Sequence, residues 1–139
     1  MFLVFLVVAV VLVGGCVGGE STPPSDQPVL SPPQGTVTYL TPQEAFALIQ
    51  ENSNNPDFVI IDVRSAERFA AGHIKGAVNL SGTVRDVLNE LDKSKIYLTY
   101  CPDGCRAPAR RMEAANFQRI YDITGGYNGW VSEGLPIVQ

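Results

Sequence analysis

The sequence predicts an α/β fold in which a parallel sheet has helices on both faces, in a single domain at residues 37–139. Segments of strand type alternate with segments of helix type throughout this stretch, which is the pattern of a parallel sheet with helical crossovers. The run Phe58–Val63 is apolar at every position except Asp62, as expected of a strand that is covered on both faces. About one hundred residues are enough for one domain with a single core.

The first strand and helix are predicted from local signals. Val37–Leu40 is predicted to be a short strand. Thr41 and Glu44 then form the pattern of a capping box, with a proline at the first helical position, so we expect a helix from here to about Asn52. A polar break at residues 54–57 separates this helix from the strand Phe58–Val63.

The middle of the domain contains shorter elements. Ser65 is predicted to cap a short helix that ends at Gly72, and Val78–Leu80 is predicted to be the next strand. The segment Val84–Leu91 is predicted to be a helix, because its apolar residues fall on one helical face.

The last third supplies two more strands. Ile96–Tyr100 is predicted to be a buried strand, followed after a tight loop by a helix over Ala107–Ala115. Asn116 can adopt the left-handed conformation that ends such a helix. Ile120–Ile123 is the last predicted strand, and a short helix around Trp130 completes the domain.

Residues 1–15 are predicted to be a lipoprotein-type signal peptide. Phe2–Val13 is an unbroken run of 12 apolar residues, the length of a secretory h-region and short for a membrane span. The sequence Val13-Gly14-Gly15-Cys16 at its end resembles the lipobox of prokaryotic lipoproteins. We therefore expect Cys16 to be the first residue of the mature chain and to carry lipid, including palmitate.

An uncleaved membrane anchor is the alternative, since the uncharged stretch continues to Gly19, although its four glycines make a poor helical span. Residues 16–36 are rich in Gly, Ser, Thr and Pro and are predicted to be a flexible tether. The lipoprotein prediction places the domain at the cell membrane, facing outside the cytoplasm in a periplasmic or extracellular location.

Charge and composition exclude several classes of protein. The net charge of −4 and the pI near 4.8 give no basic surface for nucleic acid. His73 is the single histidine, so the sequence predicts no metal site and no Ser-His-Asp triad.

Cys101 is the strongest candidate for a reactive residue. It follows the predicted strand Ile96–Tyr100, and a loop leads from it into the helix that opens near Ala107. Loop amides and the positive end of a helix favour a thiolate over a thiol. The sequence therefore predicts a nucleophilic cysteine at the carboxyl edge of the sheet, where ligands bind in folds of this class.

Four motifs occur in order along the domain, and together they resemble those of the single-domain rhodaneses, a family of sulfurtransferases. The resemblance extends from about Tyr39 to the end of the chain. The motifs are Asp62-Val63-Arg64 with Glu67 and Phe69, Gly72-His73-Ile74-Lys75-Gly76-Ala77-Val78-Asn79, Cys101-x-x-Gly104-x-Arg106-Ala107, and Gly125-Gly126 with Trp130, Gly134 and Pro136.

The resemblance implies a rhodanese-like fold and a sulfurtransferase activity without a cofactor. Cys101 would take a sulfane sulfur from a thiosulfate-like donor, hold it as a persulfide and pass it to a thiol, to cyanide or to a protein acceptor. Asp62 and Arg64 would support the site, and Arg64 is expected to form an ion pair with Glu67. The loop residues expected to bind the substrate are Pro102, Asp103, Gly104, Cys105, Arg106 and Ala107.

Three other functions remain open. Tyrosine phosphatases and arsenate reductases share this fold but have five residues between Cys and Arg, whereas only four separate Cys101 from Arg106. Thiol–disulfide exchange between Cys101 and Cys105 is a second alternative. We expect the Cys105 side chain to turn outward, because a loop that holds an anion points its amides inward. A non-catalytic sulfur carrier or docking module is the third alternative.

Overall fold

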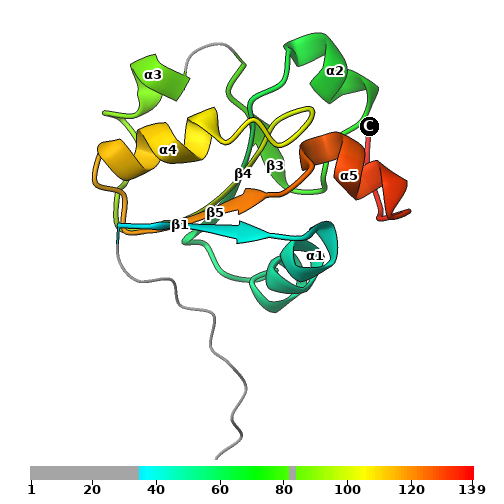
Figure 1. The fold of residues 1–139 in the computed structure, drawn as a ribbon, viewed down its shortest axis with the longest axis horizontal. Coiled ribbons are helices and arrows are strands. Elements are labelled where there is room, and N and C mark those ends of the chain that lie inside the picture. The colour runs from blue at the N-terminus through cyan, green and yellow to red at the C-terminus, as the bar shows by residue number, and fades with distance from the viewer. Residues whose placement is uncertain (1–34, 82–83) are drawn as a thin grey trace, which may run out of the picture.

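The computed structural model describes residues 35–81 and 84–139, which form one five-stranded parallel sheet (Figure 1). The strands lie in the order β1-β5-β4-β2-β3, so β4 is the central strand. The strands are β1 (Val37–Leu40), β2 (Phe58–Asp62), β3 (Ala77–Asn79), β4 (Ile96–Tyr100) and β5 (Arg119–Ile123). The helices are α1 (Pro42–Glu51), α2 (Ala66–Ala71), α3 (Val84–Val87), α4 (Ala107–Ala114) and α5 (Gly126–Ser132).

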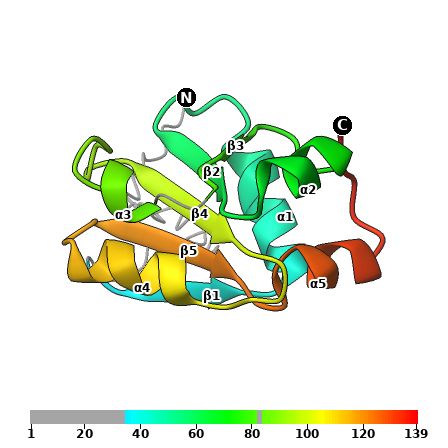
Figure 2. The same cartoon turned by 90° about the horizontal axis from the view of Figure 1, so that it is seen from above.

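The predicted fold class is confirmed, because helices cover both faces of the sheet (Figures 1 and 2). On one face, α1 and α5 pack over a core that includes Leu48, Leu98 and Trp130. On the other face, α4 packs over a second core that includes Tyr97 and Met112. The strands are apolar on both sides because each side faces a layer of helix.

The predicted caps are confirmed. The Thr41 side chain accepts a hydrogen bond from the Glu44 amide, and the Glu44 carboxylate accepts one from the Thr41 amide at 2.8 Å. Ser65 caps α2 by accepting a bond from the Arg68 amide. Asn116 has φ 63°, the left-handed conformation expected beyond α4.

Several predicted boundaries differ from the structure, including the start of β5 at Arg119 and the end of α4 at Ala114. The strand β2 ends at Asp62, although the Val63 amide still donates to the Tyr100 carbonyl at 3.2 Å. The strand β3 covers Ala77–Asn79 and not Val78–Leu80. The helix α3 stops at Val87, well before the predicted end at Leu91, because the chain turns and the amides of residues 90 and 91 both donate to the Val87 carbonyl.

The predicted signal peptide at residues 1–15, the lipid-modified Cys16 and residues 16–34 of the tether lie outside the described residues. Within residues 35–81 and 84–139, no helix has the length and apolar character needed to cross a bilayer.

Candidate active site

Cys101 lies directly after the central strand β4 and is only 2% exposed. The loop that begins with it leads over the carboxyl edge of the sheet into α4 (Figure 1). Because β4 pairs with β5 on one side and β2 on the other, the ends of three strands meet around this cysteine. The predicted nucleophile thus lies at the edge of the sheet where the sequence placed it.

The backbone of the loop is held by the first turn of α5. The carbonyl oxygens of Cys101 and Pro102 accept hydrogen bonds from the amides of Tyr127 and Asn128, at 2.8 and 2.9 Å. The Asn128 side chain also donates to the Asp103 carboxylate. These bonds turn two loop carbonyls and one loop carboxylate toward α5, so they do not compete with the amides for the Cys101 sulfur.

Two glycines allow this close packing. Gly125 and Gly126 both have positive φ, at 77° and 57°. A Cβ atom on Gly126 would lie 2.2 Å from the Cys101 carbonyl oxygen and 2.6 Å from the Gly104 nitrogen. Any side chain at this position would displace the loop, so the glycine pair is required for the position of the nucleophile.

The Cys101 sulfur accepts a hydrogen bond from the Cys105 amide, with 2.6 Å between the nitrogen and Sγ. Gly104 and Arg106 on either side of Cys105 both have left-handed backbone conformations, with φ 75° and 55°. These conformations curl the loop back over the sulfur. An amide donor at this distance stabilises a thiolate or another sulfur anion.

The Cys105 side chain also interacts with Cys101. Burial and hydrogen bonding to the Cys101 sulfur raise the pKa of the Cys105 thiol to about 11. The residue is exposed to solvent, and its backbone amide is the group that donates to the nucleophile. The expectation that this side chain turns outward stays a prediction, since the residue is exposed while its thiol interacts with Cys101.

Arg106 is exposed, and its guanidinium lies over the ring of Tyr39 on β1, with 4.7 Å from Cζ to the ring centroid. The carbonyls of Cys101 and Pro102 are bonded by α5 amides rather than by this side chain. Ala107 begins α4, so the positive end of that helix follows the loop at once.

Asp62 and Arg64 form a buried ion pair beside the loop. The carboxylate accepts the Arg64 backbone amide at 2.8 Å and its Nη2 at 2.7 Å, and Nη2 also donates to the Gly72 carbonyl. The Arg64 guanidinium stacks on Tyr127, 3.6 Å from the ring centroid. The expected ion pair between Arg64 and Glu67 is wrong, because Asp62 lies two residues away on the same buried side.

Asp122 is a site residue that the sequence analysis missed. It lies in β5, is 2% exposed, and accepts a hydrogen bond from Thr99 Oγ1 at 2.8 Å. Its second oxygen has no hydrogen-bond partner within the described part of the chain. Burial raises the pKa of this carboxyl, while Thr99 and the Arg106 charge lower it. The sequence signal that could have identified Asp122 is its charged side chain in the otherwise apolar strand segment Ile120–Ile123.

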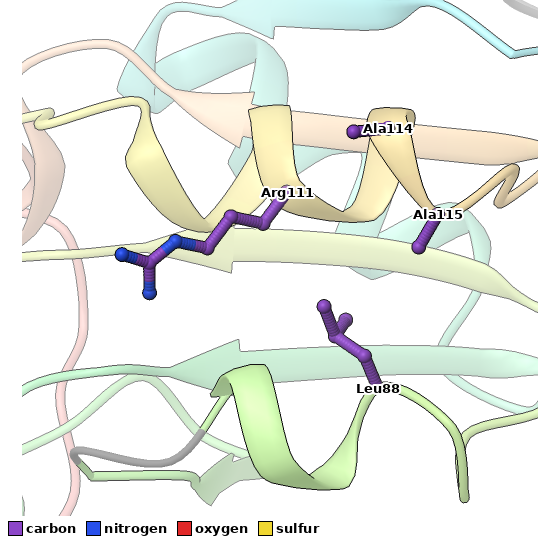
Figure 3. Close-up of a pocket in the computed structure, with 4 residues that line it drawn as sticks. All are labelled: Leu88, Arg111, Ala114 and Ala115. Atoms are coloured by element: carbon purple, nitrogen blue, oxygen red, sulfur yellow. The ribbon is translucent and has the colours of Figure 1, made fainter.

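Two hollows lie away from the loop. One, of about 340 Å³, lies between α4 and the segment after α3, and Arg111 extends along it (Figure 3). The other, of about 420 Å³, includes Phe46, Phe58 and Trp130 on the opposite face. No residue of the Cys101–Ala107 loop lines either hollow.

The Rhodanese-like domain profile matches residues 45–133. The chain belongs to the rhodanese family. Thiosulfate sulfurtransferase GlpE of Glaesserella parasuis is 33% identical to this rhodanese over 105 residues, which are 73% of this chain and 94% of GlpE. The Escherichia coli protein YibN, described as uncharacterized, is 34% identical over 109 residues, 74% of this chain and 73% of its own.

Solved structures agree on the fold of this rhodanese. A rhodanese-related protein from Thermoplasma volcanium superposes with a TM-score of 0.60 at 25% identity, over 72% of this chain and 96% of its own. Thiosulfate sulfurtransferase from Pseudomonas aeruginosa gives 0.61 at 19% identity, over 78% of this chain and 20% of its own. The relatives show that this chain is a rhodanese-type sulfurtransferase.

Proposed function

We propose that Cys101 takes a sulfane sulfur from a small donor, carries it as a persulfide and passes it to a nucleophilic acceptor. The observation that carries this proposal is the amide of Cys105, which donates to Cys101 Sγ at 2.6 Å. The same loop would hold the outer sulfur of a persulfide anion, because this anion needs the same kind of donor.

The loop supports sulfur transfer better than phosphate transfer. Four residues separate Cys101 from Arg106, and the backbone of Gly126 packs directly against the loop backbone at Cys101 and Gly104. A short loop suits a single sulfur atom, whereas a tetrahedral oxyanion needs more room and more amides. One structural neighbour, from Rhodopseudomonas palustris, is described as a possible tyrosine phosphatase, but its 24% identity supports the fold alone.

We expect electrostatic attraction to contribute little to the binding of the sulfur donor. The Asp103 carboxylate lies in the loop, and the nearby Asp122 is buried, so both oppose the approach of an anion such as thiosulfate. Arg106 supplies a positive charge next to the loop. Transfer from a neutral or protein-bound sulfane donor is consistent with this balance, as is a role as a sulfur carrier for one protein partner.

We also propose that the domain is tethered to the outer side of a membrane through lipid on Cys16. The support is the apolar run Phe2–Val13 and the lipobox-like sequence after it. Cys16→Ala should release the chain from the membrane or leave it unprocessed. A native protein that retains Met1 by mass spectrometry would contradict the lipoprotein proposal.

The test of sulfur transfer is the intact mass of the full chain before and after thiosulfate or an organic persulfide, with and without reductant. We expect the mass of one sulfur atom to appear, to map to the Cys101 peptide and to disappear with reductant. A folded Cys101→Ser variant should lose transfer almost completely. Undiminished transfer by that variant would overturn the proposal, and faster hydrolysis of an aryl phosphate would favour a phosphatase.

The contribution of Arg106 has a matched control on the same helix. Arg106→Ala should weaken transfer by about 10- to 100-fold, or about 1.4–2.7 kcal/mol. Arg111→Ala removes the same charge from the last turn of α4, where the side chain extends along the hollow of Figure 3. Equal losses in the two variants would show that only the overall charge matters.

A further inference from the structure

Two thiols share the active-site loop, and the structure brings them together. Cys101 is buried and Cys105 is exposed, and the Cys105 amide donates a hydrogen bond to the Cys101 sulfur. The proposed persulfide chemistry uses only Cys101. A second thiol on the residue whose amide contacts the nucleophile is therefore unexplained by sulfur transfer to an external acceptor.

The backbone geometry suits a bond between the two sulfurs. The Cys105 nitrogen lies 2.6 Å from Cys101 Sγ. Because an N–Cα bond is about 1.46 Å long, the Cys105 Cα lies at most about 4.1 Å from that sulfur. Because Sγ is two bonds from the Cys101 Cα, this bound allows the two Cα atoms to lie within the separation of about 4.4–6.8 Å found across disulfides. The left-handed residues Gly104 and Arg106 hold the chain in this curled form.

We propose that Cys105 is a resolving thiol that attacks Sγ of persulfidated Cys101, expels hydrosulfide and leaves a Cys101–Cys105 disulfide. This inference rests on the proposed function, because it needs sulfur on Cys101 first. It gives the protein a second outcome for a bound sulfur, namely release as sulfide when no acceptor arrives.

The step balances. The bond between Cys101 Sγ and the outer sulfur breaks, and a bond between Cys101 Sγ and Cys105 Sγ forms. The outer sulfur leaves with the electron pair and is reduced to sulfide, while the two cysteine sulfurs supply the two electrons as they become a disulfide. The proton of the Cys105 thiol ends on the sulfide, giving HS⁻. A dithiol reductant then restores both thiols for another cycle.

In the protein without bound sulfur, Cys101 reacts with the donor before Cys105 can react. Contact with the Cys101 sulfur helps raise the pKa of Cys105 to about 11, so Cys105 stays a thiol near neutral pH and does not compete for the donor. Only when Cys101 holds a sulfur does its Sγ carry a bond to a leaving group, so attack by Cys105 follows the loading of sulfur.

The experiment uses the full chain, first reduced and freed of reductant, then treated with thiosulfate in the absence of an acceptor. Sulfide is measured over time, and thiols are then blocked with an alkylating agent so that the peptides can be mapped by mass. We expect wild type to release sulfide in proportion to protein and to contain a peptide pair linked through Cys101 and Cys105. The Cys105→Ser variant should retain the persulfide on Cys101 and release at least tenfold less sulfide.

The outcomes separate the two proposals. Absence of added sulfur on Cys101 in both proteins would mean that the proposed function fails with this donor, and an organic persulfide repeats the test. A persulfide that stays on wild-type Cys101 while Cys105 is fully alkylated would overturn the resolving role alone. The wild-type time course, in which loss of free Cys105 must match the appearance of sulfide, decides the question even if Cys105→Ser does not fold.

Discussion

Two buried aspartates flank Cys101, and their surroundings differ. Asp62 ends β2 and Asp122 lies near the end of β5, and both strands pair with β4. Asp62 is neutralised by Arg64, which reaches it through the backbone amide and two side-chain nitrogens. Asp122 has one hydrogen bond, from Thr99, and one oxygen without a partner among the described residues.

The two aspartates have different effects on the site: Asp62 supports its structure, and Asp122 affects the pKa of a neighbouring thiol. The Asp62–Arg64 pair ties β2 to the Gly72 carbonyl and to the ring of Tyr127, whose amide holds Cys101. It supports the loop without leaving a charge beside it. Asp122 forms no ion pair among the described residues, although the Arg106 charge lowers its pKa, and Asp122 in turn helps to raise the pKa of Cys105. A balanced pair stabilises structure, whereas an unbalanced buried charge changes reactivity.

The largest effect is expected from Asp62→Ala. Removing the carboxylate leaves the Arg64 charge buried without an anionic partner, which costs about 3–5 kcal/mol. Urea unfolding of wild type and variant measures this loss. Asp62→Asn, which keeps an acceptor for the Arg64 amide, should lose less. A loss below about 1 kcal/mol in the alanine variant would mean that the pair behaves like an exposed one.

Thr99→Val should be next in size. The change preserves shape but removes the one hydrogen bond to the Asp122 carboxylate, at a cost of about 1–3 kcal/mol near neutral pH. The cost should shrink in acid, where the carboxyl is protonated and needs the donor less. Thr38→Val on the edge strand β1 is the matched control. Equal losses of stability in these two variants would mean that the hydrogen bond to Asp122 makes no particular contribution.

Asp122→Asn should stabilise the protein above acidic pH. The pKa of Asp122 is raised in the folded state from an ordinary value of about 3.9. As pH rises past that value the unfolded chain releases its proton first, so wild type loses stability until the folded carboxyl has also ionised. The variant lacks this loss and should gain on the order of 1 kcal/mol by neutral pH. Urea unfolding at several pH values checks this, and a gain that grows toward acid would contradict it.

The smallest expected effect is that of Asp122→Asn on the pKa of the Cys105 thiol. Asp122 makes the least of the contributions that raise the pKa of this thiol to about 11, so Asp122→Asn should lower it modestly. The pH dependence of Cys105 alkylation, followed by peptide mapping in a Cys101→Ser background, measures the shift. Asp103→Asn is the control, because the Asp103 carboxylate is turned toward Asn128. An equal shift from both changes would show only a change in net charge.

Most of the fold was predictable because its signals are local. The capping box at Thr41, the cap at Ser65 and the left-handed Asn116 each depend on neighbouring residues. The end of α3 was not predictable from its apolar pattern, since the chain turns at Val87 while Leu88 still reaches the core. Amphipathic spacing records which side chains are buried and does not record whether the backbone between them stays helical.

The sequence by itself determined the family, the nucleophile Cys101 and the strand that delivers it, because a motif and an apolar strand are read along the chain. Tertiary structure decided what surrounds the sulfur. The pairing of Arg64 with Asp62, the seating of the loop on Gly126 and the isolation of the Asp122 carboxylate depend on contacts between strands and helices far apart in sequence. The approach of the Cys105 amide to the sulfur was also decided there, because it follows from the backbone angles of the folded loop.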